Sequence, residues 1–151
     1  MIEITTSQHH EMLAHAEADF PNECCGLLFG RGARAENLRR MENVEHSPLN
    51  YRVDPKALLD VFDEMDQRGL DLVSIYHSHT HSPAYPSKTD RDLAGYPEAL
   101  YLIVSLQHRQ EPVIRAFRIV QGQVSEEPIE IRDKATAGPG RSAGEQEVEP
   151  R

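Results

Sequence analysis

Cysteine is almost absent from this sequence. Of 151 residues only two are cysteines, and they are the neighbours Cys24 and Cys25. Adjacent cysteines rarely pair with each other, and without a C-x-x-C spacing neither a thiolate zinc ribbon nor a thioredoxin-type redox site is available. We therefore expect both thiols to be small buried hydrophobes, with a nucleophilic role as the alternative. Any metal ion must then be held by histidine and carboxylate.

Positive charge and long apolar runs are also scarce. The net charge is −9, which argues against non-specific binding to nucleic acid. No apolar run approaches the roughly 18–20 residues that span a bilayer. The first residues, MIEITTSQHHEML, lack the basic and then apolar pattern of a signal peptide. We therefore expect a cytoplasmic protein with neither membrane nor nucleic acid as a partner.

The length and composition predict one folded domain. Hydrophobic residues make up 38% and charged residues 27% of the chain, as in ordinary globular proteins. The composition changes at residue 133, because KATAGPGRSAGEQEVEPR contains almost no large apolar side chain. Such a segment cannot bury a core. We expect residues 1–132 to form the domain and residues 133–151 to be a disordered tail.

Hydrophobic periodicity predicts an α/β domain with a mixed sheet and about three helices. Asp54 suits a helix N-cap and Gly69 a helix end, so the segment between them is the clearest helix. Other helices are expected at 9–19 and 87–95. Strands are expected at 24–30, 35–44, 70–79, 99–106 and 113–120, with 123–131 as the hairpin partner of the last.

Chemistry-bearing residues gather in HSHTHSPAYPSKTD, residues 77–90. His77, His79 and His81 alternate, so an extended backbone places all three rings on one side. A zinc site with an open position usually takes three protein ligands. The alternation leaves two arrangements open: three histidines around one metal ion, or two histidines with a ligand from further along.

Ser87 and Asp90 follow with the S-x-x-D spacing of a helix N-cap. Most such pairs only cap a helix, but capping is compatible with a second role at a site mouth. His77-x-His79, seven residues and Ser87-x-x-Asp90 together resemble the signature of the JAMM (MPN+) zinc metallopeptidases. Glu23 in PNECCGLLFG occupies the position of that family's upstream glutamate. The stretch NVEHSPLNYRVDP extends the resemblance over most of residues 1–130.

The resemblance implies a curved mixed sheet like that of cytidine deaminases and one zinc ion per chain. His77, His79 and Asp90 would be the metal ligands, with water as the fourth. Glu23 would act as general base and then as general acid, and Ser87 would donate to the oxyanion. His81 fits the face of the strand but not the spacing of the motif, so we expect it to be a rim residue that touches substrate or solvent. A register shifted to His79, His81, Thr89 and Asp92 stays open, although it loses the serine.

The resemblance is nearest to small bacterial members that act on ubiquitin-like sulfur-carrier proteins ending in Gly-Gly. The stretches YHSHT, AYPSKTD and FRIV-x-G-x-V-x-EEP resemble that branch. They imply hydrolysis of the amide after the carrier's terminal glycine, as in release of cysteine from a carrier adduct. The alternative is a non-catalytic MPN-type scaffold, and a homodimer is left open. A zinc deaminase, which uses H-x-E with P-C-x-x-C, is disfavoured because the histidine motif here is H-x-H and the sequence has no C-x-x-C.

Overall fold

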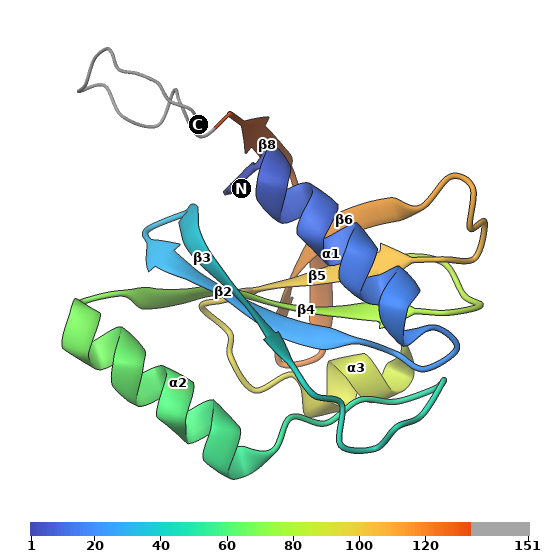
Figure 1. The fold of residues 1–151 in the computed structure, drawn as a ribbon, viewed down its shortest axis with the longest axis horizontal. Helices are drawn as coiled ribbons and strands as arrows, with labels where there is room; N and C mark the ends of the chain where they lie inside the picture. Colours follow the sequence, from blue (N-terminus) through green and yellow to red (C-terminus); the bar gives the residue numbers. More distant parts are fainter. Residues whose placement is uncertain (134–151) are drawn as a thin grey trace.

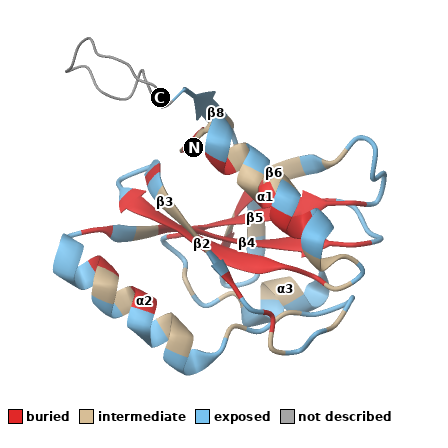
Figure 2. Cartoon of the chain, in the orientation of Figure 1, coloured by how far each residue is buried: buried red, intermediate tan, exposed pale blue. Residues whose placement is uncertain are grey.

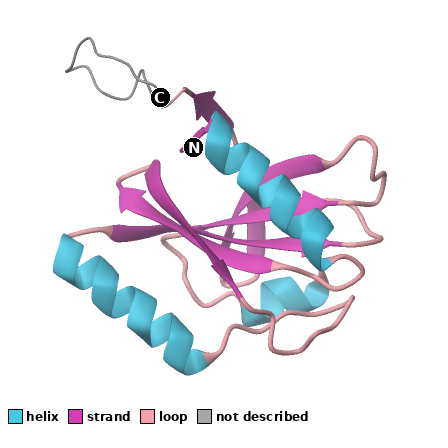
Figure 3. Ribbon diagram, viewed as in Figure 1, coloured by secondary structure: helices cyan, strands magenta, loops and turns pink. Residues whose placement is uncertain are grey.

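A mixed sheet of eight strands forms the centre of the protein in the computed structural model, which describes residues 1–133 (Figures 1 and 3). The strands are β1 (Ile2–Thr5), β2 (Cys25–Arg31), β3 (Arg34–Met41), β4 (Asp71–His79), β5 (Leu100–Ser105), β6 (Val113–Val120), β7 (Gln123–Glu127) and β8 (Ile129–Arg132). The helices are α1 (Thr6–Asp19), α2 (Pro55–Arg68) and α3 (Lys88–Leu93). The predicted α/β class with three helices is confirmed.

The strand order across the curved sheet is β7-β6-β5-β4-β2-β3-β1-β8. β4 lies in the interior, antiparallel to β2 and parallel to β5. Both β4 and β5 are buried along almost their whole length (Figure 2). Continuous apolar runs suit such a position, because both faces of a central strand are covered.

The two faces of the sheet carry different helices. Met12 and Ala16 of α1 pack with Leu28 and Tyr76 on one face. On the other face, Val61 of α2 belongs to a second apolar cluster with Leu27, Phe29, Ile75, Tyr101 and Ile103. Since side chains alternate along a strand, odd-numbered residues at this end of β2 and β4 face the second cluster.

Some predicted boundaries were wrong. α1 begins at Thr6 rather than His9, because Thr5 is its N-cap and forms a capping box with Gln8. β1, which was not predicted, lies between β3 and β8. The segment 123–131 is divided at Pro128, because its first half pairs with β6 and its second half with β1. Local patterns do not encode such long-range pairing.

The predicted tail lies outside the described residues except for Asp133, whose carboxylate accepts a hydrogen bond from the Thr6 hydroxyl. Among residues 1–133, no helix combines the length and apolar character needed to cross a membrane.

Gly26 of β2 lies directly opposite Tyr76 of β4. A Cβ at residue 26 would lie 2.3 Å from atoms of the buried Tyr76 ring. We therefore expect Gly26→Ala to lower the free energy of unfolding by roughly 1–3 kcal/mol, as overpacking of a core does. Gly95→Ala is the control, because the nearest atom to its Cβ would be 3.9 Å away. Urea unfolding measures both, and equal stability of the two variants would contradict the close fit at Gly26.

Candidate metal centre and active site

The carboxyl end of β4 supplies the two central histidines. His77 and His79 lie on the same face of the strand, and both side chains are almost completely buried. Their Nε2 atoms are 3.2 Å apart. Neighbouring strands on both sides hold this end of β4, since His77 pairs with Cys25 of β2 and with Ile103 of β5. The two rings are therefore presented by a rigid part of the sheet.

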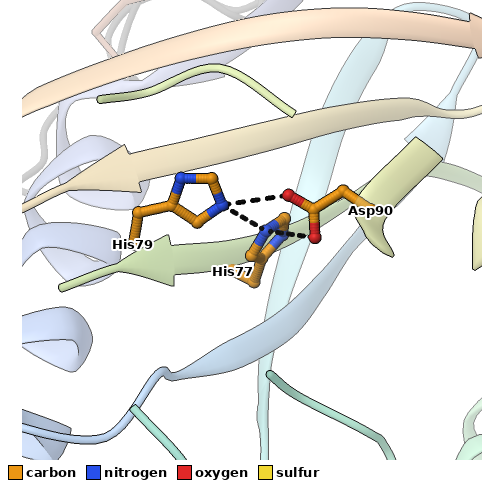
Figure 4. Close-up of side chains that lie close together, drawn as sticks. All are labelled: His77, His79 and Asp90. Carbon is orange, nitrogen blue, oxygen red and sulfur yellow. Dashed lines mark hydrogen bonds and ion pairs between the residues drawn. The ribbon is translucent and has the colours of Figure 1, made fainter. Parts of the chain in front are cut away.

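Asp90 reaches the same point from α3 (Figure 4). One carboxylate oxygen lies 3.2 Å from Nε2 of His77, and the other lies 2.9 Å from Nε2 of His79. Ser87 fixes this carboxylate, because its N–H donates to Asp90 Oδ2 at 2.9 Å. In return the Asp90 N–H donates to Ser87 Oγ at 3.1 Å. The predicted cap thus also aims the aspartate at the histidines.

These three side chains fit a zinc ion. A tetrahedral site with bonds of about 2.0–2.1 Å has ligand atoms about 3.3 Å apart, and the spacings here are 2.9–3.2 Å. Nδ1 of His79 donates to the carbonyl of Pro83 at 2.8 Å. Because a carbonyl only accepts, the proton sits on Nδ1 and the Nε2 lone pair is free for a metal. Among residues 1–133, this trio of side chains forms the group whose possible ligand atoms lie close enough together, within 4.8 Å of one another, to share one metal ion.

The electrostatics of the trio also favour a cation. Burial alone would raise the pKa of Asp90, but its close polar contacts with Nε2 of His77 and of His79 outweigh burial and hold that pKa well below its usual range. Burial lowers the pKa of His77 below its usual value. For His79 burial acts in the same direction, but the Asp90 carboxylate and the Pro83 carbonyl outweigh it and raise the pKa. The site therefore offers an ionised carboxylate and a neutral His77.

Glu23 lies two residues before the start of β2 and close to the trio. The N–H of Ser78 donates to the carbonyl of Cys24 at 3.1 Å, which continues the register of β2 and β4 past Cys25 and His77. One more step along that register sets Glu23 opposite His79. Glu23 is only 5% exposed. Burial, reinforced by the charge of Asp90 and opposed by His79, raises its pKa to about 8. Such a carboxyl can accept and return a proton near neutral pH.

Ser78 supports this arrangement from the opposite face of β4. Its hydroxyl accepts a hydrogen bond from the N–H of Cys24 at 2.8 Å, a supporting contact to the neighbouring strand. Cys24 and Cys25 are fully buried, and burial raises the pKa of each thiol to about 12. Since a thiolate is the reactive form, burial in protonated form suits the packing role and not the nucleophilic one.

The structure separates His81 from the trio. Its side chain is exposed, its Nδ1 lies 2.9 Å from the Thr80 hydroxyl, and its ring lies 5.7 Å from that of Phe20. In the shifted register Asp92 would be a ligand, but it forms an ion pair with Lys88 instead. The geometry therefore favours the first register, with His81 at the rim.

Two contributors were missed in the sequence. The Tyr51 ring stacks on that of His77, and Asn43 donates a hydrogen bond to the carbonyl of Glu23 at 3.0 Å. Both belong to the loop between β3 and α2, for which periodicity gives no signal. The same loop helps to line a cavity of about 520 Å³ beside Asp90, whose wall includes Tyr51, Tyr96 and Tyr101.

The comparisons with known proteins agree with this geometry. Residues 5–120 match the family Prok-JAB, described as prokaryotic homologs of the JAB domain. The chain therefore belongs to the JAB/MPN family, and the resemblance inferred from its motifs is confirmed.

Three named relatives illustrate the range of that family. The CysO-cysteine peptidase of Mycobacterium tuberculosis is 44% identical over 122 residues, which cover 80% of this chain and 84% of the relative. A probable TtuB-protein conjugate cleaving protease of Thermus thermophilus is 37% identical, with 75% and 72% covered. A desampylase of Haloferax volcanii is 33% identical, with 69% and 80% covered.

Solved structures give the same fold. A protein from Desulfitobacterium hafniense is 39% identical with a TM-score of 0.80, covering 89% of this chain and 94% of the other. A JAB1/MPN domain protein from Archaeoglobus fulgidus is 18% identical with a TM-score of 0.59, covering 86% and 98%. The expected JAMM/MPN fold is thereby confirmed.

The arrangement predicts which histidines bind metal. His77→Ala and His79→Ala should each lower zinc affinity by at least about 100-fold, because each removes one of three protein ligands. His81→Ala should bind zinc as the unchanged protein does, since its ring lies outside the trio. Zinc content after dialysis against a weak chelator measures this. Loss of zinc from His81→Ala with retention in His77→Ala would favour the shifted register instead.

Proposed function

We propose that the protein is a zinc-dependent peptidase that hydrolyses the amide bond after the C-terminal glycine of a ubiquitin-like sulfur-carrier protein. The observation that carries the proposal is the convergence of His77, His79 and Asp90 beside the buried carboxyl of Glu23. A family relative named as a peptidase, 44% identical over most of both chains, supports the reaction class. One zinc ion would be held per chain.

Different residues would have different roles in the reaction. His77, His79 and Asp90 would hold the zinc ion, which when bound supplies Lewis acidity and a water that ionises near neutral pH. Glu23, as general base, would take a proton from the attacking water. As general acid, it would then return that proton to the leaving nitrogen. A carboxyl whose pKa burial raises towards neutral pH can both accept and return a proton.

Ser87 is proposed to stabilise the oxyanion that forms at the attacked carbonyl. Its oxygen already accepts the Asp90 N–H, which leaves the hydroxyl proton free to be donated. A side-chain donor in such a role is worth roughly 100- to 1,000-fold in rate by comparison with other enzymes. His81 at the rim is proposed to contact the substrate.

The relatives and the cavity support the proposed substrate class. The names of two relatives state action on a CysO-cysteine adduct and on TtuB-protein conjugates. A slim Gly-Gly tail can enter a cavity of about 520 Å³ lined by tyrosines and aliphatic side chains, and extended peptides commonly bind alongside strands. Release of cysteine from a carrier adduct is the reaction we propose, with a cytoplasmic location. The scaffold alternative is disfavoured because every ligand position is filled.

Cleavage of defined conjugates tests the function. We expect the zinc-loaded protein to release cysteine from a Gly-Gly carrier with a C-terminal cysteine, or lysine from an isopeptide-linked carrier, as followed by mass spectrometry. Glu23→Gln should retain zinc but lose about 10²- to 10⁴-fold in kcat, because the proton acceptor is removed while its size is kept.

The zinc content of each sample distinguishes the outcomes. Full activity of Glu23→Gln with zinc bound would refute the role of Glu23. No cleavage of either conjugate by the zinc-loaded protein would refute the substrate class and favour the scaffold.

A further inference from the structure

The loop between β3 and α2 makes specific contacts with two parts of the candidate site. It is closed at its base by an isolated bridge between Asn43 and Val53. From this loop Tyr51 contacts His77 and Asn43 contacts the backbone of Glu23. The two contacts act on different groups: Tyr51 touches a proposed metal ligand, and Asn43 touches the backbone of the proposed base.

His77 and His79 are oriented in different ways. The ring of His79 is fixed by the hydrogen bond from Nδ1 to the Pro83 carbonyl. Nδ1 of His77 is buried and has no hydrogen-bond partner among residues 1–133. Metal-binding histidines are usually oriented by a hydrogen bond at the second nitrogen. The Pro83 carbonyl fixes the orientation of the His79 ring, so the orientation of the His77 ring must be fixed by packing instead.

Tyr51 provides that packing. Its ring centroid lies 4.5 Å from that of His77, and the two planes are only 23° apart. A parallel ring at this distance opposes rotation of the imidazole, because turning it would drive its edge into the tyrosine face. We propose that Tyr51 is a positioning residue that holds His77 in its metal-binding orientation. This inference rests on the proposed zinc site.

Zinc affinity tests this proposal without any assay of activity. We expect Tyr51→Leu to weaken zinc binding by about 10-fold or more, as loss of an orienting neighbour does. Tyr51→Phe keeps the ring and should bind zinc within about twofold of the unchanged protein. Tyr96→Leu is the control, since Tyr96 lines the same cavity but packs on Phe62. Competition with a chromophoric chelator gives each dissociation constant.

The possible outcomes distinguish failure of the role proposed for Tyr51 from failure of the proposed zinc site. Equal zinc affinity of folded Tyr51→Leu and the unchanged protein, or equal losses in Tyr51→Leu and Tyr96→Leu, would overturn the role of Tyr51. Absence of zinc binding by the unchanged protein would instead refute the zinc site itself. If circular dichroism shows Tyr51→Leu unfolded, Tyr51→Met takes its place in the same comparison.

Asn43 supports a second inference through its hydrogen bonds. Its Nδ2 donates to the carbonyls of Glu23 and Asn50, both at 3.0 Å. Its Oδ1 accepts from the N–H groups of Glu45 at 3.0 Å and Arg52 at 3.1 Å. This buried amide thus uses two donors and two acceptor positions, its full capacity.

The backbone of Glu23 is held by the same loop on both sides. Its carbonyl accepts from Asn43, and its N–H donates to the carbonyl of Ser47 at 2.8 Å. The loop therefore fixes where the Glu23 side chain begins. We infer that Asn43 positions Glu23 for proton transfer without contacting the substrate. This inference also rests on the proposed function.

Asn43→Asp tests this inference, because it keeps the shape but loses both donated hydrogen bonds. We expect kcat to fall about 10-fold, while KM and zinc affinity stay within about twofold. Asn37→Asp is the matched control, since Asn37 lies on β3 and accepts from Arg68. A drop in zinc affinity that parallels the drop in kcat, or an unchanged kcat, would overturn the inference.

If Asn43→Asp does not fold, Asn43→Ser is compared in the same way, and failure of both to fold would mean that Asn43 is needed for the loop as a whole, against a specific role. Inactivity of the unchanged protein on every carrier conjugate would count against the proposed substrate class, while the Tyr51 experiment would stand.

Discussion

The antiparallel register of β2 against β4 is the constraint on which the site depends. It is fixed at Gly26, where the missing side chain makes room for the Tyr76 ring across the strands. A slip by one residue would move every side chain to the other face. Glu23 would then leave the face that carries His77 and His79. A packing contact on the helix α1 side therefore sets the chemistry on the opposite side.

Two kinds of segment surround the trio. β4 presents the histidines rigidly, since β2 and β5 hold it on both sides, while α3 and the β3–α2 loop bring Asp90 and Tyr51 from more exposed parts of the chain. Their positions depend on capping and side-chain hydrogen bonds rather than on the sheet ladder. Thr80 adds one such link, because its hydroxyl donates to the carbonyl of Pro48 at 3.1 Å.

Much of the site could be predicted from the sequence, and the reason is local. His77, His79, Ser87 and Asp90 lie within fourteen residues, so strand alternation and a capping box nearly determine their geometry. Glu23 was found through a family resemblance, because only the β2–β4 pairing brings it near. The positions of β1 and β8 and the contacts of Tyr51 and Asn43 depend on long-range pairing and loop closure, which no local pattern encodes.

Cys24 and Cys25 follow Glu23 in the chain, yet both thiols are buried in the core as neutral groups. Thiol–disulfide exchange requires an accessible thiolate, so the folded protein resists mixed disulfides with thiol-bearing peptides or free cysteine. Oxidation to sulfenic acid follows the same requirement. The sulfur atoms next to this site of histidines and carboxylates are thus protected from both reactions by the fold.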